Sequence, residues 1–194
     1  MIVYLSASSS ERDRARWALD CIKDAPDLVL AHDWLSEIED KYGGIANHGI
    51  TLEAAGPIAW TSIAHVVRSA TLWLLIPEKA TFGAGVELGA FAVASMSGLG
   101  APRRIVASGP GPDVSVFTGL ADTYFEHDAD ALKHLYETAR ELRERERVVK
   151  RVPASELTEA AQAAAALVVP PGPPHRVGDL ECLCRMCLPV PGEV

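Results

Sequence analysis

The stretch Thr71-Leu72-Trp73-Leu74-Leu75-Ile76-Pro77 contains no charged residue and ends at a proline. A continuous apolar run of this kind is typical of a strand that is buried on both faces, which is the position of a central strand in a parallel sheet. The proline ends the strand because it has no N–H group to donate to a neighbouring strand. We therefore expect residues 71–76 to lie in the middle of an α/β sheet.

Short apolar runs alternate with amphipathic stretches on both sides of this strand. Further strands are predicted at residues 2–5, 28–31, 104–108 and 123–125, and helices at 11–22, 57–69, 83–96 and 128–149. This alternation predicts an α/β fold with a parallel sheet of about five strands in three layers, because right-handed crossovers place helices on both faces of the sheet. Residues 43–56 contain four glycines without a clear period, so we expect a long loop there and a helix that opens at Pro57.

The composition limits what the protein can bind. The chain has 194 residues, with 26 Asp and Glu against 18 Lys and Arg, which gives a net charge of −8. A general nucleic-acid binder needs a basic face, so nucleic acid is not expected as a partner. We find no apolar stretch of about 18 residues and no signal-peptide pattern at Met1, which favours a cytoplasmic protein without a membrane partner.

The composition changes near residue 150, so we predict an α/β domain over 1–150 and an extension over 151–194. The extension contains an Ala-rich helical segment at 155–167, a Pro-rich linker at 170–174 and a tail with Cys182, Cys184 and Cys187. These cysteines and His175 have chemistry that suits zinc. Their compressed spacing, without a second pair, favours a thiol-bearing tail instead, so we expect no metal or other cofactor.

The segment Thr81-Phe82-Gly83-Ala84-Gly85-Val86-Glu87-Leu88-Gly89-Ala90 follows the central strand and begins a helix. Gly83 and Gly85 allow a ligand to approach the backbone, and free N–H groups at the start of a helix attract anions. An ionised Glu87 in the first turns is the type of group that displaces a leaving group at the anomeric carbon of a sugar. A glutamate that only caps a tightly packed helix is the alternative interpretation.

Polar loops follow three of the predicted strands, at residues 6–10, 32–34 and 78–82. The carboxyl ends of parallel strands meet at one edge of a sheet, so these loops are expected to form one cleft. A dinucleotide site is disfavoured, because the glycine pattern does not follow the first strand and residues 105–108 have no acidic end for a ribose.

Three segments, Val3-Tyr4-Leu5-Ser6, Leu72–Ile76 and Gly83-x-Gly85-x-Glu87-Leu88-Gly89, resemble the nucleoside 2-deoxyribosyltransferase superfamily. The resemblance is strongest to its branch of 2′-deoxynucleoside 5′-phosphate N-hydrolases and cytidylate N-glycosidases. It covers roughly residues 1–135 and implies a Rossmann-like fold and a homodimer. It also implies a small-molecule nucleotide as substrate, with cleavage of the N-glycosidic bond that needs neither a metal nor a redox cofactor.

The resemblance also implies roles for individual residues. Glu87 matches the catalytic glutamate that acts at C1′, and Tyr4 matches an aromatic residue near the sugar and base, with Trp34 expected beside them. Thr81 falls where the hydrolase branch places a hydroxyl on the 5′-phosphate. The rest of the phosphate side is expected in a loop with hydroxyl and guanidinium groups: Ser6, Ser8 and Ser10 with Arg12 or Arg14.

The chain departs from the family pattern at one position. The family usually has an aspartate in the helix before the central strand, which would fall near Ile63, and this segment has no carboxylate. Four residues are candidates to replace it: His65, Ser62, Asp33 and Glu53. The sequence therefore leaves three functions open: an N-glycosidase or deoxyribosyltransferase acting on a nucleoside 5′-monophosphate, a non-catalytic nucleotide-binding sensor, and an NAD-cleaving glycohydrolase.

Overall fold

The computed structural model describes residues 1–42, 51–77, 82–97, 103–110 and 119–151. The chain divides into two compact units, Met1–Arg147 and Val148–Val194. The first unit contains the sheet and the helices that surround it. The predicted Ala-rich segment, Pro-rich linker and cysteine tail lie outside the described residues, and the extension over 151–194 stays a prediction.

The sheet has five parallel strands in the order β2-β1-β3-β4-β5. The strands are β1 (Ile2–Ser6), β2 (Val29–Leu30), β3 (Thr71–Leu75), β4 (Arg104–Ser108) and β5 (Thr123–Phe125). The prediction of a parallel sheet of about five strands is confirmed. β3 lies in the middle of the order, and every residue of this strand is buried, as expected for its apolar sequence.

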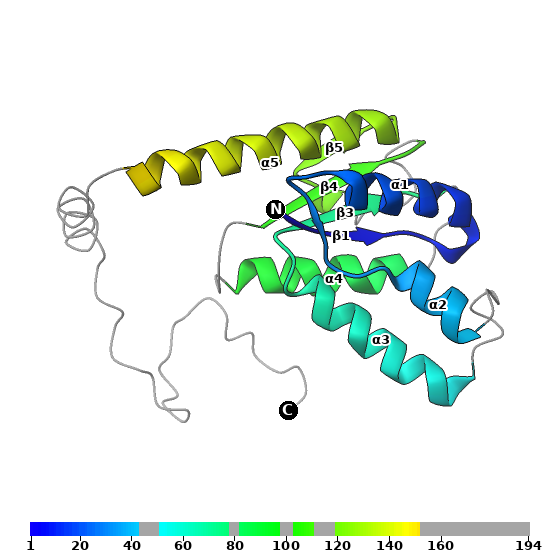
Figure 1. Cartoon of the computed structure of the whole chain (residues 1–194). Coiled ribbons are helices and arrows are strands. Elements are labelled where there is room, and N and C mark those ends of the chain that lie inside the picture. The colour runs from blue at the N-terminus through cyan, green and yellow to red at the C-terminus, as the bar shows by residue number, and fades with distance from the viewer. Residues whose placement is uncertain (43–50, 78–81, 98–102, 111–118, 152–194) are drawn as a thin grey trace, which may run out of the picture. The chain divides into compact units, whose positions relative to one another are not determined.

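Helices cover both faces of this sheet (Figure 1). They are α1 (Arg12–Asp24), α2 (Trp34–Tyr42), α3 (Leu52–Val66), α4 (Phe82–Met96) and α5 (Asp128–Arg151), and a short 3₁₀ turn, η1 (Ser9–Glu11), precedes α1. Figure 1 shows α1 and α5 on one side of the sheet and α3 and α4 on the other. This is the three-layer, Rossmann-like arrangement that the alternating pattern predicted.

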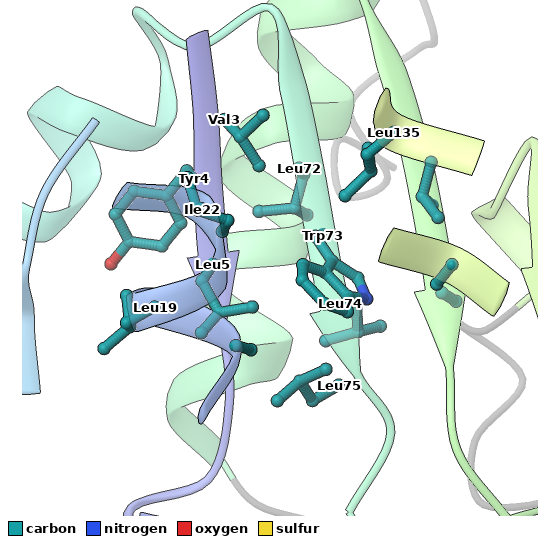
Figure 2. Close-up of a cluster of buried hydrophobic side chains, with 14 of the residues drawn as sticks. Val3, Tyr4, Leu5, Leu19, Ile22, Leu72, Trp73, Leu74, Leu75 and Leu135 are labelled. Carbon is teal, nitrogen blue, oxygen red and sulfur yellow. The ribbon is translucent and has the colours of Figure 1, made fainter. Parts of the chain in front are cut away.

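The core lies on both sides of β1 and β3 (Figure 2). Because successive side chains of a strand point to opposite faces, Val3 and Leu5 lie on one face of β1, and Tyr4 lies on the other. Trp73 is fully buried, and its indole N–H donates to the Ser108 hydroxyl of β4 at 2.9 Å. The sheet therefore fixes the position of Tyr4 on the face that α4 covers.

Two features of the helices differ from the prediction. The helix expected to open at Pro57 begins at Leu52, so residues 52–56 do not belong to a loop. Pro57 is exposed, and water can bind the Glu53 carbonyl group that loses its helical N–H partner there. Helix α2 was not predicted; it has nine residues, and such a short helix depends on tertiary packing, which a local pattern does not reveal.

Candidate active site

β1 lies between β2 and β3, so the sheet extends from β1 to β2 on one side and from β3 to β5 on the other. The direction in which successive strands are added therefore reverses between β1 and β3. In open α/β sheets, ligands bind in the crevice at such a switch point, beyond the carboxyl ends of the strands. A cavity of about 310 Å³ lies there, between α2, α3 and α4. Its lining is formed by Ala7, Trp34, Ile38, Ala55, Ile58, Ala59, Ser62, Ile63, Gly83, Val86 and Glu87.

Three side chains of the predicted site meet at Glu87, which lines this cavity, whereas Tyr4 and Ser6 are fully buried behind the lining. The Tyr4 hydroxyl donates to Oε1 of Glu87 at 2.6 Å, and the Ser6 hydroxyl donates to Oε2 of the same carboxylate at 2.6 Å. Both oxygens of Glu87 are therefore held, while the residue still lines the cavity and keeps partial exposure. Glu87 is the one carboxylate among the described residues that line this cavity.

The local sequence explains this arrangement. Tyr4 and Ser6 are two residues apart in β1, so both side chains point to the same face of the sheet, toward α4. Glu87 lies in the second turn of α4, which begins at Phe82, and reaches back to both hydroxyls. The hydrogen bonds from β1, rather than the free N–H groups of the first helical turn, therefore orient its carboxylate.

Burial and hydrogen bonds act against each other on the acidity of Glu87. Burial raises the pKa of the Glu87 carboxyl above its ordinary value, and the bonds from Ser6 and Tyr4 lower it in part. Burial and the neighbouring Glu87 charge raise the pKa of Tyr4, so its phenol stays protonated and remains a hydrogen-bond donor. A hydrogen bond with Ser62 partly offsets this rise, which extends the chain of polar contacts from Glu87 to α3.

Trp34 forms one wall of the cavity from the start of α2. Its indole N–H donates to the Leu5 carbonyl of β1 at 2.9 Å, and the residue is buried. This bond fixes the ring beside the cavity instead of leaving it free to turn. A fixed aromatic wall suits a planar ligand group such as a nucleobase.

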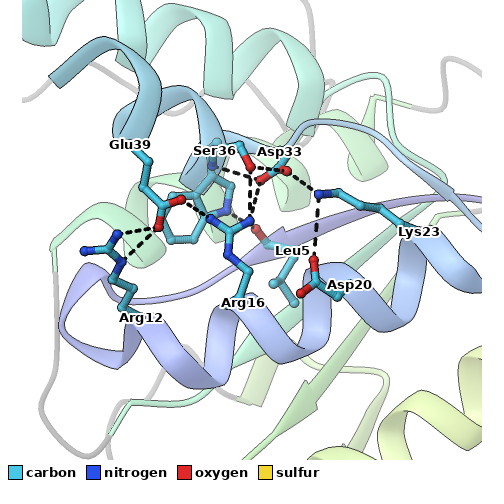
Figure 3. A network of polar contacts seen from close by, with 9 residues as sticks. Leu5, Arg12, Arg16, Asp20, Lys23, Asp33, Ser36 and Glu39 are labelled. Carbon is cyan, nitrogen blue, oxygen red and sulfur yellow. Dashed lines mark hydrogen bonds and ion pairs between the residues drawn. The ribbon is translucent and has the colours of Figure 1, made fainter. Parts of the chain in front are cut away.

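The predicted phosphate-side residues are only partly brought together. Ser8 is buried, and its hydroxyl accepts the Ser10 N–H at 3.1 Å as the cap of η1. The Ser8 and Ser10 hydroxyls are 2.6 Å apart. Arg12 instead binds Glu39 of α2, with 2.6 Å between Nη2 and Oε1, within the polar network of α1 and α2 (Figure 3). Thr81 lies outside the described residues.

Arg14 does not belong to the cavity lining, and its contacts lie with α5 and with the carboxyl ends of β3 and β4. Its Nε and Nη2 atoms donate to the two carboxylate oxygens of Asp128 at 2.6 and 2.7 Å. The same guanidinium donates to Glu11 and to the carbonyl groups of Ile76 and Ser108. Arg14 thus ties α1 to α5 and to the ends of β3 and β4, and the pairing lowers the pKa of Asp128 against the opposing effect of burial. These contacts give Arg14 a structural position in the fold.

Gly83 lines the cavity, whereas Gly85 is exposed on α4 outside the lining. Ile63, near which the family's aspartate would fall, also lines the cavity, so this part of the wall is apolar. Ser62 is the one candidate replacement in the lining.

The other candidates to replace the aspartate have different surroundings. Asp33 binds Lys23 and Ser36, and the His65 ring stacks on His32 with 4.7 Å between ring centres. Glu53 is exposed on α3. None of these three side chains lines the cavity in the part of the chain that the structure describes.

Sequence reasoning missed the apolar walls of the cavity. Ile38 comes from α2, which was not predicted, and Ala55 comes from the part of α3 that was expected to be a loop. The apolar residues at 55, 58, 59 and 63 follow helical spacing and predict this face when the helix is taken to begin before Pro57.

Within the described ranges, no group of three or more His, Cys, Asp and Glu side chains is arranged to hold a metal ion. None of the helices in these ranges is long and apolar enough to cross a membrane. The three cysteines of the tail lie outside them.

No protein-family model matches the chain, and no curated protein matches it by sequence. Among solved structures, the chain is similar to a CMP N-glycosidase of Clostridium botulinum, with 8% sequence identity and a TM-score of 0.42. The match covers 70% of this chain and 98% of that chain. A likeness of this degree assigns neither a family nor an activity.

Proposed function

We propose that the protein cleaves the N-glycosidic bond of a nucleoside 5′-monophosphate, or transfers its deoxyribosyl group, through Glu87 at C1′. The observation that carries the proposal is the carboxylate held by Tyr4 and Ser6 at the edge of a cavity of about 310 Å³. The resemblance of residues 81–90 to the deoxyribosyltransferase superfamily supports the same role.

The chemistry needs a negative charge on one face of the sugar. Loss of the base develops positive charge at C1′ in an oxocarbenium-like transition state. Glu87 either attacks this carbon to form a glycosyl-enzyme intermediate or stabilises the charge while another nucleophile attacks. In the first case, the C1′–N bond breaks as the C1′–O bond to Glu87 forms, and water or a second base then takes the sugar.

Tyr4 and Ser6 would act as positioning residues, each holding one carboxylate oxygen of Glu87 in place at the edge of the cavity. Trp34 would lie against the base, and Gly83 leaves space for the ligand at the start of α4. The phosphate would lie near the Ser8–Ser10 turn and Arg12, and Thr81 stays a predicted phosphate ligand from the resemblance alone. Arg12 could exchange Glu39 for the phosphate at a small cost in free energy, because surface ion pairs contribute about 0–1 kcal/mol.

The proposal is tested by release of free base. The protein is incubated with ribo- and 2′-deoxynucleoside 5′-monophosphates and with NAD, and free base or nicotinamide is measured by chromatography. We expect release from at least one monophosphate, reduced by a factor on the order of 10³ or more in Glu87→Ala. Glu141→Ala, an exposed glutamate of α5, is the matched control and should keep full activity. Unchanged release in Glu87→Ala would remove the catalytic role.

The apolar Ile63 in the cavity lining favours a second candidate, a nucleotide-binding protein without turnover. Calorimetry separates the two functions. Binding of a monophosphate without release of base over hours would favour the sensor and contradict the enzyme.

We also propose that the protein is a homodimer in the cytoplasm, as the resemblance and the composition imply.

A further inference from the structure

Two histidines at the borders of the cavity walls stack on each other. His32 lies between β2 and α2, and His65 lies in the last turn of α3. Their ring centres are 4.7 Å apart, and the ring planes differ by 18°. Trp34 and Ile38 of α2 and Ile63 of α3 line the cavity, so the stack joins the elements that form two of its walls.

The surroundings of His32 favour a positive charge on its ring. Its Nε2 atom lies 2.6 Å from Oε2 of Glu37, and the His32 side chain is only 11% exposed. The other carboxylate oxygen of Glu37, Oε1, accepts a hydrogen bond from Lys41 at 2.5 Å. The single negative charge of Glu37 is therefore shared between Lys41 and His32, and little of it remains to stabilise a second protonated ring.

A proton on His65 is disfavoured in this stack. Burial lowers the pKa of His65, and the neighbouring His32 ring and Arg68 lower it further. Glu37 and a hydrogen bond with the Ala31 backbone act in the opposite direction. Two protonated rings with centres 4.7 Å apart would repel each other, and this partly buried site screens the repulsion less than water does. The closed stack therefore favours a neutral His65.

One ring atom of the stack lacks a hydrogen-bond partner. Nδ1 of His32 is buried and forms no hydrogen bond with any residue that the structure describes. A buried polar atom without a partner costs free energy, and water could bind this nitrogen if the two rings separated. This cost reduces the stability of the closed stack relative to an open form in which both rings are hydrated.

We propose that the His32–His65 stack is an acid-sensitive latch, which separates and frees α2 from α3 when His65 takes up a proton. In the open form His65 contacts water and its pKa returns to the ordinary value, so protonation favours opening. The ratio of open to closed forms changes by up to about tenfold for each unit of difference in pKa. Because α2 begins at the cavity residue Trp34, opening would widen the cavity. The latch does not depend on the catalytic role of Glu87.

The acidic groups next to the stack titrate at lower pH than the histidines. A hydrogen bond from Lys41 lowers the pKa of Glu37 below its ordinary value. Burial raises the pKa of Asp33, but hydrogen bonds from Lys23 and Ser36 outweigh this effect and lower it overall. Both carboxylates therefore remain ionised at pH 5, and a response between pH 8 and pH 5 reports on the histidines.

Hydrogen exchange of α2 in the full chain, measured by mass spectrometry at pH 8 and pH 5, tests the proposal without a ligand. A synthetic peptide of residues 32–42 gives the intrinsic exchange rate at each pH, so that protection factors can be compared. A helix of nine residues is not stable without packing, so α2 exchanges once it is freed. We expect the protection factor of α2 to fall by about threefold or more from pH 8 to pH 5, without an equal fall in β3.

Two substitutions remove the titrating group of His65 in different ways. His65→Phe keeps a flat ring against His32, and His65→Gln keeps a side-chain N–H for the Ala31 backbone. In both variants the protection of α2 should be the same at pH 5 and pH 8. His134→Phe is the matched control, because His134 of α5 contacts Phe125 instead of the stack, and it should keep the natural response.

Three results would overturn the proposal. The first is equal protection of α2 at both pH values in the natural chain. The second is a fall in protection that persists in either folded variant of His65. The third is an equally large fall in β3, because acid would then destabilise the whole domain instead of releasing α2.

Discussion

Removal of the Tyr4 hydroxyl isolates the effect of one hydrogen bond on Glu87. In Tyr4→Phe the ring still fills its fully buried position, but the 2.6 Å bond to Oε1 is lost. This bond stabilises the ionised carboxylate, so its loss favours the protonated form and raises the pKa of Glu87. The pKa of Glu87 is already raised by burial, and the Ser6 bond would remain to oppose that rise.

The magnitude follows from the strength of the bond. A hydrogen bond to a charged group contributes about 1.5–3 kcal/mol, and one pKa unit corresponds to about 1.4 kcal/mol. We therefore expect the pKa of Glu87 to rise by about one to two units in Tyr4→Phe. ¹³C NMR of labelled glutamate carboxyl groups measures this titration without a substrate.

Two controls define the result. Ser6→Ala removes the bond to the other oxygen and should shift the pKa in the same direction. Tyr136→Phe removes a phenol that donates to the Cys21 carbonyl, not to Glu87, and should leave this pKa unchanged. A pKa of Glu87 that is unchanged or lower in Tyr4→Phe would refute the reasoning, because the phenol would then not stabilise the carboxylate.

Two further predictions concern stability. Burial makes the pKa of Glu87 higher in the folded than in the unfolded chain. The free energy of unfolding therefore falls as the pH rises from the pKa of the unfolded chain through the pKa of the folded chain. Glu87→Gln should therefore unfold at a higher temperature than the natural chain at pH 8, with a difference that shrinks toward pH 4; equal melting curves at pH 8 would contradict this. Gly109 has a φ of +134°, and a Cβ atom there would lie 2.6 Å from Nη2 of Arg14 and 2.7 Å from the Ile76 carbonyl oxygen. In urea unfolding, Gly109→Ala should lose on the order of 2–4 kcal/mol, whereas Gly119→Ala, in open space, should lose little; similar losses in both would remove the argument.

The strands were predictable because their apolar patterns are local. β4 (Arg104–Ser108) and β5 (Thr123–Phe125) have the predicted bounds, and the apolar run at Thr71 is the buried centre of the sheet. The α3 boundary was not predictable by the same means. Proline occurs most often in the first turn of a helix. Pro57 is tolerated in the second turn of α3 because its side of the helix faces water.

The sequence singled out some of the residues at the cavity, but not their geometry or the apolar walls around them. Tyr4, Ser6 and Glu87 were each singled out, yet only the strand pairing and the course of α4 bring them into hydrogen-bond contact. Arg14 shows the opposite case. A guanidinium next to a serine loop suggested an anion site, but Asp128, more than 100 residues away in sequence, binds it in the folded chain. Such long-range pairing leaves no local signal.

A crystal structure of Glu87→Gln with a 2′-deoxynucleoside 5′-monophosphate tests the central claim most directly. The substitution keeps the shape of the side chain and removes its charge, so the substrate should remain intact. We predict that C1′ of the sugar lies about 3–3.5 Å from a side-chain atom of Gln at this position, with the base against Trp34. A nucleotide bound with its sugar elsewhere, or a cavity that stays empty at saturating nucleotide, would contradict the account.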